Sequence, residues 1–174
     1  MLKEAGANMV KIEKTSQNER ENQGSADATI FANIHNGKVR DFIMKKVIPN
    51  IDILIDSFRP GVMERLELGP ADVHAINPNL IYVRVSGYGH ATKLNNKDVI
   101  SKAGRDVNFL AASGVLSKFR RNDKVGPPVI PANLLSYYCS GSTFVFVQIL
   151  RAIIDRKPRQ VLDCNLTAQL AYTS

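Results

Sequence analysis

Short apolar runs alternate with polar, helix-spaced segments along the chain, and this alternation carries the first structural prediction. Residues 51–58 (IDILIDSF) are dense in isoleucine and leucine, as expected of a strand whose two faces are both covered. The same kind of run, bounded by turn residues, predicts further strands at 9–14, 29–34, 80–85 and 161–166.

The segments between these runs have the spacing of helices. In residues 37–48, four apolar side chains recur at helical intervals before Pro49. Shorter helices are expected at 62–68 and 70–76, the second with Pro70 in its first turn. Strands that alternate with helices predict an α/β fold built on a parallel sheet with right-handed crossovers.

The longest apolar segment, residues 134–154, is long enough to raise the question of a membrane span. It carries four serine and threonine side chains together with Gln148 and Arg151, a polar load that is costly in lipid. We therefore expect a helix buried between the sheet and another layer, and no membrane partner.

In parallel sheets, ligands bind beyond the carboxyl ends of the strands. The loops at that edge are expected after Lys14, Phe58 and Val85, and the last two are rich in glycine or proline. Such loops let backbone approach a ligand closely, although ordinary turn chemistry explains the same residues about equally well.

Composition fits a single soluble domain, since 44% of the residues are hydrophobic and 22% are charged. The net charge of +7 is compatible with nucleic acid, a membrane surface or a polyanionic small molecule. The basic residues form no arginine-rich or aromatic-interleaved run, so nucleic acid is not an expected partner.

The two cysteines lack the spacing of a metal site or a redox motif. Cys139 lies in the long apolar segment and is expected to be a buried thiol. Charged residues at Lys3, Glu4 and Lys11 interrupt any apolar run at the start, so the chain shows no secretory signal peptide. The compartment, whether mitochondrial, peroxisomal or cytoplasmic, stays open.

Several motifs, in order along the chain, resemble those of the alpha-methylacyl-CoA racemases, which belong to the wider family III CoA-transferases. They are residues 6–13 (GANMVKIE), 58–66 (FRPGVMERL), 68–70 (LGP), 77–82 (NPNLIY), 86–89 (SGYG), 103–117 (AGRDVNFLAASGVLS) and 160–166 (QVLDCNL). The resemblance implies a Rossmann-like parallel sheet flanked by helices, part of the family's large domain. It makes residues 1–174 a partial CoA-binding large domain, truncated at both ends, without the family's second domain. Partners implied are an acyl-CoA, a second copy or a full-length paralogue.

The racemases exchange a proton beside a thioester, which needs a base on one face and an acid on the other. In the positions that the resemblance aligns with the catalytic His and Asp, this chain has Arg105 and Tyr137. Arginine stays protonated, and a phenol has a reference pKa near 10, so neither fits the task. The transferase nucleophile aligns with Ala168, which has no nucleophilic atom. Asp163 is expected to be a turn or cap carboxylate.

CoA binding is better preserved than catalysis in this comparison. The loop at 23–28 (QGSADA) lacks the family's basic residues, so weaker binding of the CoA phosphates is expected. No metal and no permanently bound cofactor are expected, and a CoA thioester is the expected substrate or ligand. The expected CoA-binding residues are Lys14, Ala32, Asn33, Ile34, His35, Arg59, Gly61, Gly87, Tyr88, Gly89, Gly104, Arg105, Asp106 and Asn108.

Three functions stay open at this point. The chain could be an acyl-CoA racemase fragment that acts on 2-methylacyl-CoA, inactive as it stands. It could be a non-catalytic CoA-binding or regulatory relic, which the chemistry of its substituted positions favours. A family III CoA-transferase is disfavoured by Ala168.

Overall fold

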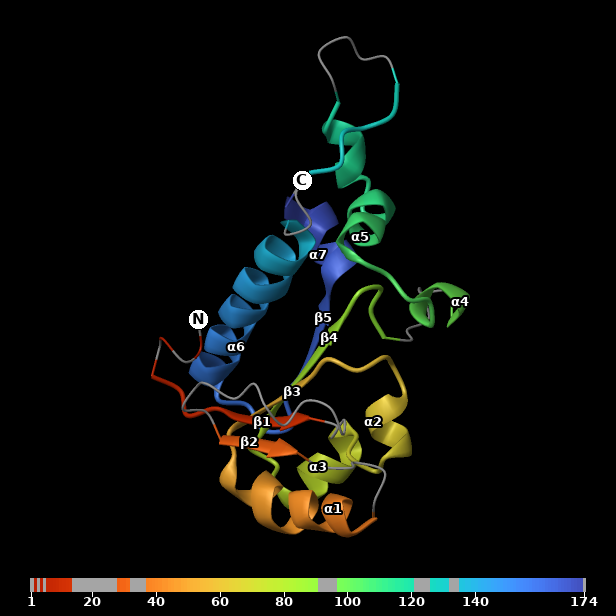
Figure 1. Cartoon of the computed structure of the whole chain (residues 1–174). Coiled ribbons are helices and arrows are strands. Elements are labelled where there is room, and N and C mark those ends of the chain that lie inside the picture. Colours follow the sequence, from red (N-terminus) through yellow and green to blue (C-terminus); the bar gives the residue numbers. More distant parts are fainter. Residues whose placement is uncertain are drawn as a thin grey trace.

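The computed structural model describes residues 2, 4, 6–13, 28–31, 37–90, 97–120, 126–131 and 135–173. Each of its strands overlaps a run that the hydrophobic pattern predicts (Figure 1). The strands are β1 (Val10–Glu13), β2 (Ala28–Phe31), β3 (Ile53–Asp56), β4 (Ile81–Ser86) and β5 (Val161–Asn165).

Helices separate the strands as the spacing predicts. The predicted helix at 37–48 is an α-helix that continues as a π-turn and a 3₁₀ turn, and this last turn runs through Pro49 to Asn50, past the predicted end. The helical elements are α1 (Gly37–Phe42), η1 (Ile43–Val47), η2 (Ile48–Asn50), α2 (Val62–Arg65), α3 (Pro70–Ile76), α4 (Lys97–Ile100), α5 (Asp106–Ala112), η3 (Val115–Lys118), η4 (Leu135–Thr143), α6 (Phe144–Asp155) and α7 (Leu166–Thr173).

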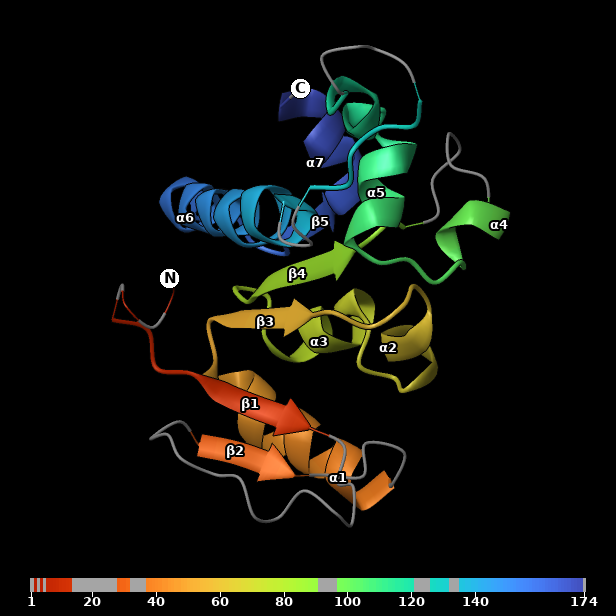
Figure 2. The same ribbon diagram turned by 45° about the horizontal axis from the view of Figure 1, so that its top comes forward.

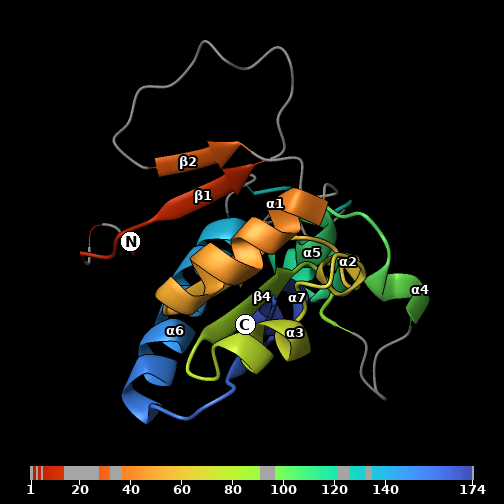
Figure 3. The same cartoon turned by 90° about the horizontal axis from the view of Figure 1, so that it is seen from below.

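All strand pairs within the described residues are parallel, so the α/β fold class is confirmed. The strands form two sheets, however, with β1 paired to β2 and a second sheet in the order β3–β4–β5. In Figure 2 the strands follow one another in the order β4, β3, β1, β2. In Figure 3 β1 and β2 form a ribbon of their own, apart from β4. Since no ladder joins β1 to β3, the predicted parallel sheet is divided between them.

The three-stranded sheet is covered on both faces because neighbouring residues of β4 point to opposite sides. Tyr82 packs with Ile48 and Val73 in one core cluster, on the side of α3. Ile81 and Val83 pack with Ile149 of α6 in another cluster. Figure 1 shows α6 on one side of this sheet and α2 and α3 on the other. Double coverage explains why the predicted strands read as continuous apolar runs.

The long apolar helix differs from the prediction in how it is covered. One stripe of α6, including Val145, Ile149 and Ala152, is buried against the sheet, whereas the opposite side, including Leu150 and Ile154, is exposed. The prediction that this helix is buried between two layers is therefore wrong, because the described residues cover only one of its sides. By length and composition alone, Ser136–Asp155 is apolar enough to cross a membrane. The buried stripe of α6 packs against β4 and β5.

Candidate functional site

A cleft of about 680 Å³ opens at the carboxyl ends of β3 and β4, the edge at which parallel sheets bind ligands. Loops after both strands, the segment before α5, and one side of η4 and α6 form its walls. Ser57, Arg59, Ser86 and Lys102 are among its polar lining residues, and Ile55, Phe146 and Ile149 are among its apolar ones.

The cleft brings together residues that the sequence predicts from separate segments. Among the expected residues, Arg59, Gly87, Tyr88, Gly104 and Tyr137 line it. The other expected residues with a described position, which lie in or beside the same loops but outside the lining, are Gly61, Gly89, Arg105, Asp106 and Asn108. The remaining ones fall outside the described residues: Lys14, Ala32, Asn33, Ile34 and His35.

Lys102 and Phe146 also line the cleft, and the sequence reasoning did not select either. Lys102 immediately precedes the motif at 103–117, so a search for cations beside that motif would have found it. Phe146 could not have been found this way, because it looks like any other apolar position in its helix.

Two glycines in the cleft wall are explained by packing against the ring of Phe109. A Cβ built on Gly87 would lie 2.2 Å from Phe109 Cε1, and one built on Gly104 would lie 2.4 Å from the same atom. The ring also meets Tyr88 and Tyr137 edge-on, at centroid distances of 5.1 and 6.3 Å. Phe109 therefore holds the loop after β4 and the loop before α5 together.

We expect Gly87→Ala to lower the free energy of unfolding by about 1–3 kcal/mol, the usual cost of overpacking, because Phe109 is buried and cannot swing away easily. Gly37→Ala is the matched control, since a Cβ at Gly37 meets no atom within 4 Å. Urea denaturation of both variants tests this. Equal stability of the two variants would show that the Phe109 ring can move aside without destabilising the fold.

Asp106 places Tyr137 in the cleft. Its side chain is 1% exposed, and its Oδ1 accepts hydrogen bonds from the backbone N–H groups of Ser136 and Tyr137 at 2.8 and 3.1 Å. The hydroxyl of Ser136 donates to the same oxygen. The carboxylate thus caps the start of η4 and ties it to the first turn of α5. It joins the two segments that carry Arg105 and Tyr137.

The titratable side chains that line the cleft within the described residues are two cations, Arg59 and Lys102, and two phenols, Tyr88 and Tyr137. No Asp, Glu or His is among these described lining residues. Arg105 is exposed at the N-cap of α5, where its backbone N–H donates to Asn108 at 2.9 Å. Tyr137 is 45% exposed at the cleft wall.

A row of charged side chains crosses the same end of the sheet, on the face toward α2. Arg84 forms a two-pronged contact with Asp163 of the neighbouring strand, at 2.5 and 2.7 Å, and lies 3.6 Å from Glu64. The expectation that Asp163 is a turn or cap carboxylate is therefore wrong, because β5 places it directly opposite Arg84. Asp56 lies opposite Arg84 on the other side, and its burial raises the pKa of its carboxyl.

His90 follows the loop after β4, with its Nδ1 3.5 Å from Asp163 Oδ1. Burial, reinforced by the positive charge of Arg84, lowers the pKa of His90 below its ordinary 6.5. The folded protein therefore disfavours the charged imidazole. The other histidine that the structure describes, His74, is buried, with Nε2 3.0 Å from the carbonyl oxygen of Leu80.

Lowering the pH should destabilise the protein through His90. A lowered pKa in the folded state means that its contribution to stability is present above the ordinary value and is lost as pH falls below it. We expect His90→Gln to lose less stability than the wild type between about pH 7.5 and about pH 5.5. Urea midpoints at the two pH values measure this. An unchanged pH dependence in the variant would contradict the role of His90.

The described cysteines and potential metal ligands do not form a further reactive or metal-binding site. Cys139 is exposed, not buried as predicted, because it lies on the uncovered side of η4. Cys164 is buried under α6, and burial raises the pKa of its thiol. Within the described part of the chain, no group of three or more His, Cys, Asp or Glu side chains is arranged to hold a metal ion.

Comparison with known proteins finds a family model and individual relatives that match most of the chain. The family described as CoA-transferase family III matches residues 1–173. The human and mouse proteins named "Alpha-methylacyl-CoA racemase" are each 38% identical to the chain, over 135 and 136 residues. These matches cover 76% of this chain and 34% of each racemase, so the chain spans about a third of their length.

Solved structures support the fold. The crystal structure of Rv3272 from Mycobacterium tuberculosis matches with a TM-score of 0.79 at 24% identity, over 99% of this chain and 49% of that one. A CaiB/BaiF family protein from Brucella suis matches with a TM-score of 0.79 at 20% identity, over 98% of this chain and 49% of that one. At these identities the structural matches speak for the fold alone.

Proposed function

The chain belongs to CoA-transferase family III, and we propose that its cleft binds an acyl-CoA thioester without exchanging the proton on the α carbon. One observation carries this proposal: the cleft has a cationic rim, and no Asp, Glu or His side chain lies among its described lining residues. The names of the relatives supply the ligand class, since they are racemases and transferases of acyl-CoA.

Binding is supported by the place and charge of the cleft. Arg59 follows β3 and the loop at 87–89 follows β4, so a cation and closely approachable backbone lie at one edge of the sheet. The net charge of +7 favours the approach of a polyanion such as CoA. We include Lys14 and residues 32–35 in the proposed site on the strength of the resemblance.

The lack of proton exchange is supported by the two substituted positions. A guanidinium at Arg105 cannot accept a proton, and the phenol of Tyr137 has a reference pKa of about 10. Transfer through an acyl intermediate is not proposed, because Ala168 offers no nucleophile. The form of this function that the chemistry of the substituted positions favours is a non-catalytic or regulatory relic that binds CoA or associates with a full-length paralogue.

CoA should raise the thermal unfolding midpoint of the wild-type chain, because a ligand that binds only the folded state stabilises it. Arg59→Gln should remove most of this rise. Arg65→Gln is the matched control, since Arg65 lies six residues further on, at the end of α2, and does not line the cleft. Equal shifts in both variants would place any CoA bound to the protein somewhere else.

A further inference from the structure

The described sheet is interrupted between β1 and β3. The strands on either side form parallel ladders, β1 with β2 and β3 with β4, but no ladder between described residues joins β1 to β3. Figure 2 shows β1 and β3 as neighbours whose arrows point in the same direction. We call the interval between the facing edges of Val10–Glu13 and Ile53–Asp56 the strand slot.

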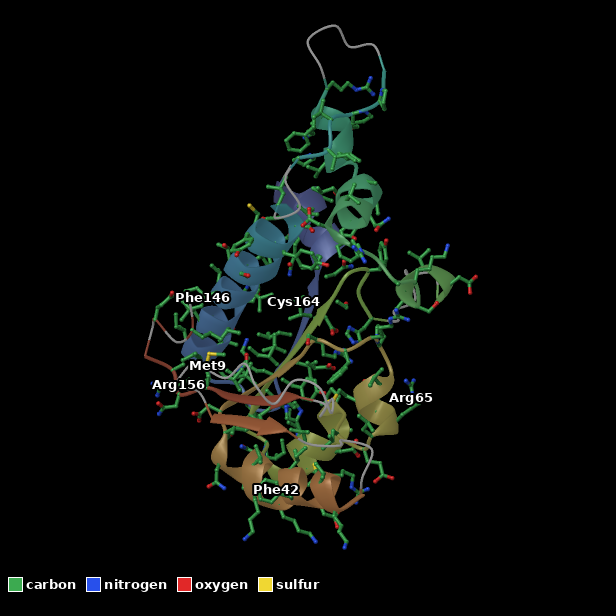
Figure 4. The ribbon with its side chains drawn as sticks, viewed as in Figure 1. Met9, Phe42, Arg65, Phe146, Arg156 and Cys164 are labelled. Atoms are coloured by element: carbon green, nitrogen blue, oxygen red, sulfur yellow. The ribbon has the colours of Figure 1, made fainter. Side chains whose placement is uncertain are left out.

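Apolar side chains border the strand slot on both faces of the sheet. On one face the cleft reaches Ile55 of β3 and Met9, the residue before β1, each of which is 43% exposed. Phe146 of α6 lines the same cleft, and Figure 4 shows Phe146 and Met9 on the same side of the sheet. On the other face Leu54 packs against the core cluster that contains Ile48. A segment in the slot would therefore have apolar contacts above and below.

We propose that an extended strand of another polypeptide inserts into the strand slot, parallel to β1 and β3, and joins the two sheets into one. The partner is an apolar segment flanked by acidic residues. This inference goes beyond the proposed function and needs no CoA, because the strand would lie between β1 and β3, whereas CoA is proposed at the loops beyond the strand ends.

Main-chain hydrogen bonding favours the slot over the outer edge of the sheet. In a parallel strand, the N–H and C=O groups of one residue face one neighbour and those of the next residue face the other. A strand in the slot can therefore form ladders with both β1 and β3. A strand added at β5, the edge strand of the described three-stranded sheet, would leave half of its main-chain groups without a ladder.

Cover and charge define the chemistry of the partner. A strand covered on both faces is a continuous apolar run, rich in valine and isoleucine. Arg59 and Lys102 lie beyond the carboxyl ends of the strands, while Arg156 and Lys157 lie between α6 and the start of β5, at the opposite edge. Acidic residues before and after the apolar run complement both edges. A second copy of the chain, with the same net charge of +7, is disfavoured as the partner.

A fluorescein-labelled peptide, Glu-Glu-Val-Ile-Val-Val-Ile-Glu-Glu, is the probe. Fluorescence anisotropy should show saturable binding to the folded chain, and hydrogen exchange should slow at the amides of β1 and β3 but not at those of β5. A folded sample that binds CoA but not the peptide overturns the insertion and leaves the proposed function standing. Slower exchange at β5 alone also overturns it.

Peptides methylated on a main-chain nitrogen separate insertion from simple apolar adhesion, because they keep every side chain. Methylation of the first valine after isoleucine, or of the next valine, removes a donor that faces one or the other neighbouring strand. Each change should weaken binding by about tenfold. If neither peptide binds more weakly than the parent, or only one of them does, the strand does not pair with both edges and the proposal is refuted.

Matched variants of the protein locate the peptide. Ile55→Asn should weaken peptide binding by about tenfold, because insertion would bury the new amide against apolar side chains. Val161→Asn is the control, since Val161 belongs to β5 and is likewise exposed, at 37%. Both positions are open enough for the fold to persist, which circular dichroism checks. Weakening by Val161→Asn as large as that by Ile55→Asn would contradict the insertion.

Discussion

Incubated in D₂O with a 2-methylacyl-CoA, the 174-residue chain is expected to incorporate deuterium at the α carbon no faster than a protein-free blank. A well-placed acid or base contributes about 10²- to 10⁴-fold to such a reaction, and no Asp, Glu or His lies among the described residues that line the cleft. Mass spectrometry of the recovered thioester measures the exchange. Incorporation well above the blank would refute the assignment of Arg105 and Tyr137 as non-catalytic replacements.

Arg105→His alone should not raise the exchange rate above the blank. The new imidazole could accept a proton on one face, but Tyr137 would still leave the opposite face without a carboxylate. A titration of the variant with CoA shows whether the sample is folded and the site is occupied. Exchange restored by this one substitution would mean that Tyr137, or a group outside the described residues, acts as the partner acid.

The second large effect is expected from Asp106→Ala, which should lower the free energy of unfolding by about 3 kcal/mol. The substitution leaves the N–H groups of Ser136 and Tyr137 without their acceptor in a buried place, and it removes the cap of η4. It should also weaken CoA binding, since the two walls of the cleft are no longer tied together.

Asp106→Asn is the matched control for this prediction. Its carbonyl oxygen can still accept both backbone hydrogen bonds, so most of the stability and of the CoA affinity should remain. Urea denaturation and CoA titration of the two variants separate the contributions. If alanine and asparagine cost the same, the negative charge at the helix start matters and the hydrogen-bond geometry does not.

The strands and the location of the cleft could be predicted from sequence because both depend on local patterns. The run that became β3 is apolar on both faces, and the turn residues after β3 and β4 lie at the edge where the parallel strands end. The division of the strands into two sheets could not be predicted, because the residues of a strand do not show which other strands it pairs with.

Contacts between residues that are far apart in the sequence could not be predicted either. Asp163 was expected to serve a turn, yet its partner Arg84 lies 79 residues away and is opposite it only through strand register. Asp106 likewise meets residues 30 and 31 positions further on. Cys139 and the outer side of α6 were expected to be buried, because an apolar segment does not reveal how many layers cover it.

Calorimetric titration of the folded wild-type chain with CoA, at low and at high salt, tests the central claim most directly. The claim predicts a measurable heat of binding at millimolar CoA in low salt. Binding should weaken markedly in about 1 M salt, where screening shortens the reach of Arg59 and of the net positive charge to about 3 Å. No heat of binding at millimolar CoA in low salt, from a sample shown to be folded, would contradict the account and leave the cleft a structural feature without this ligand.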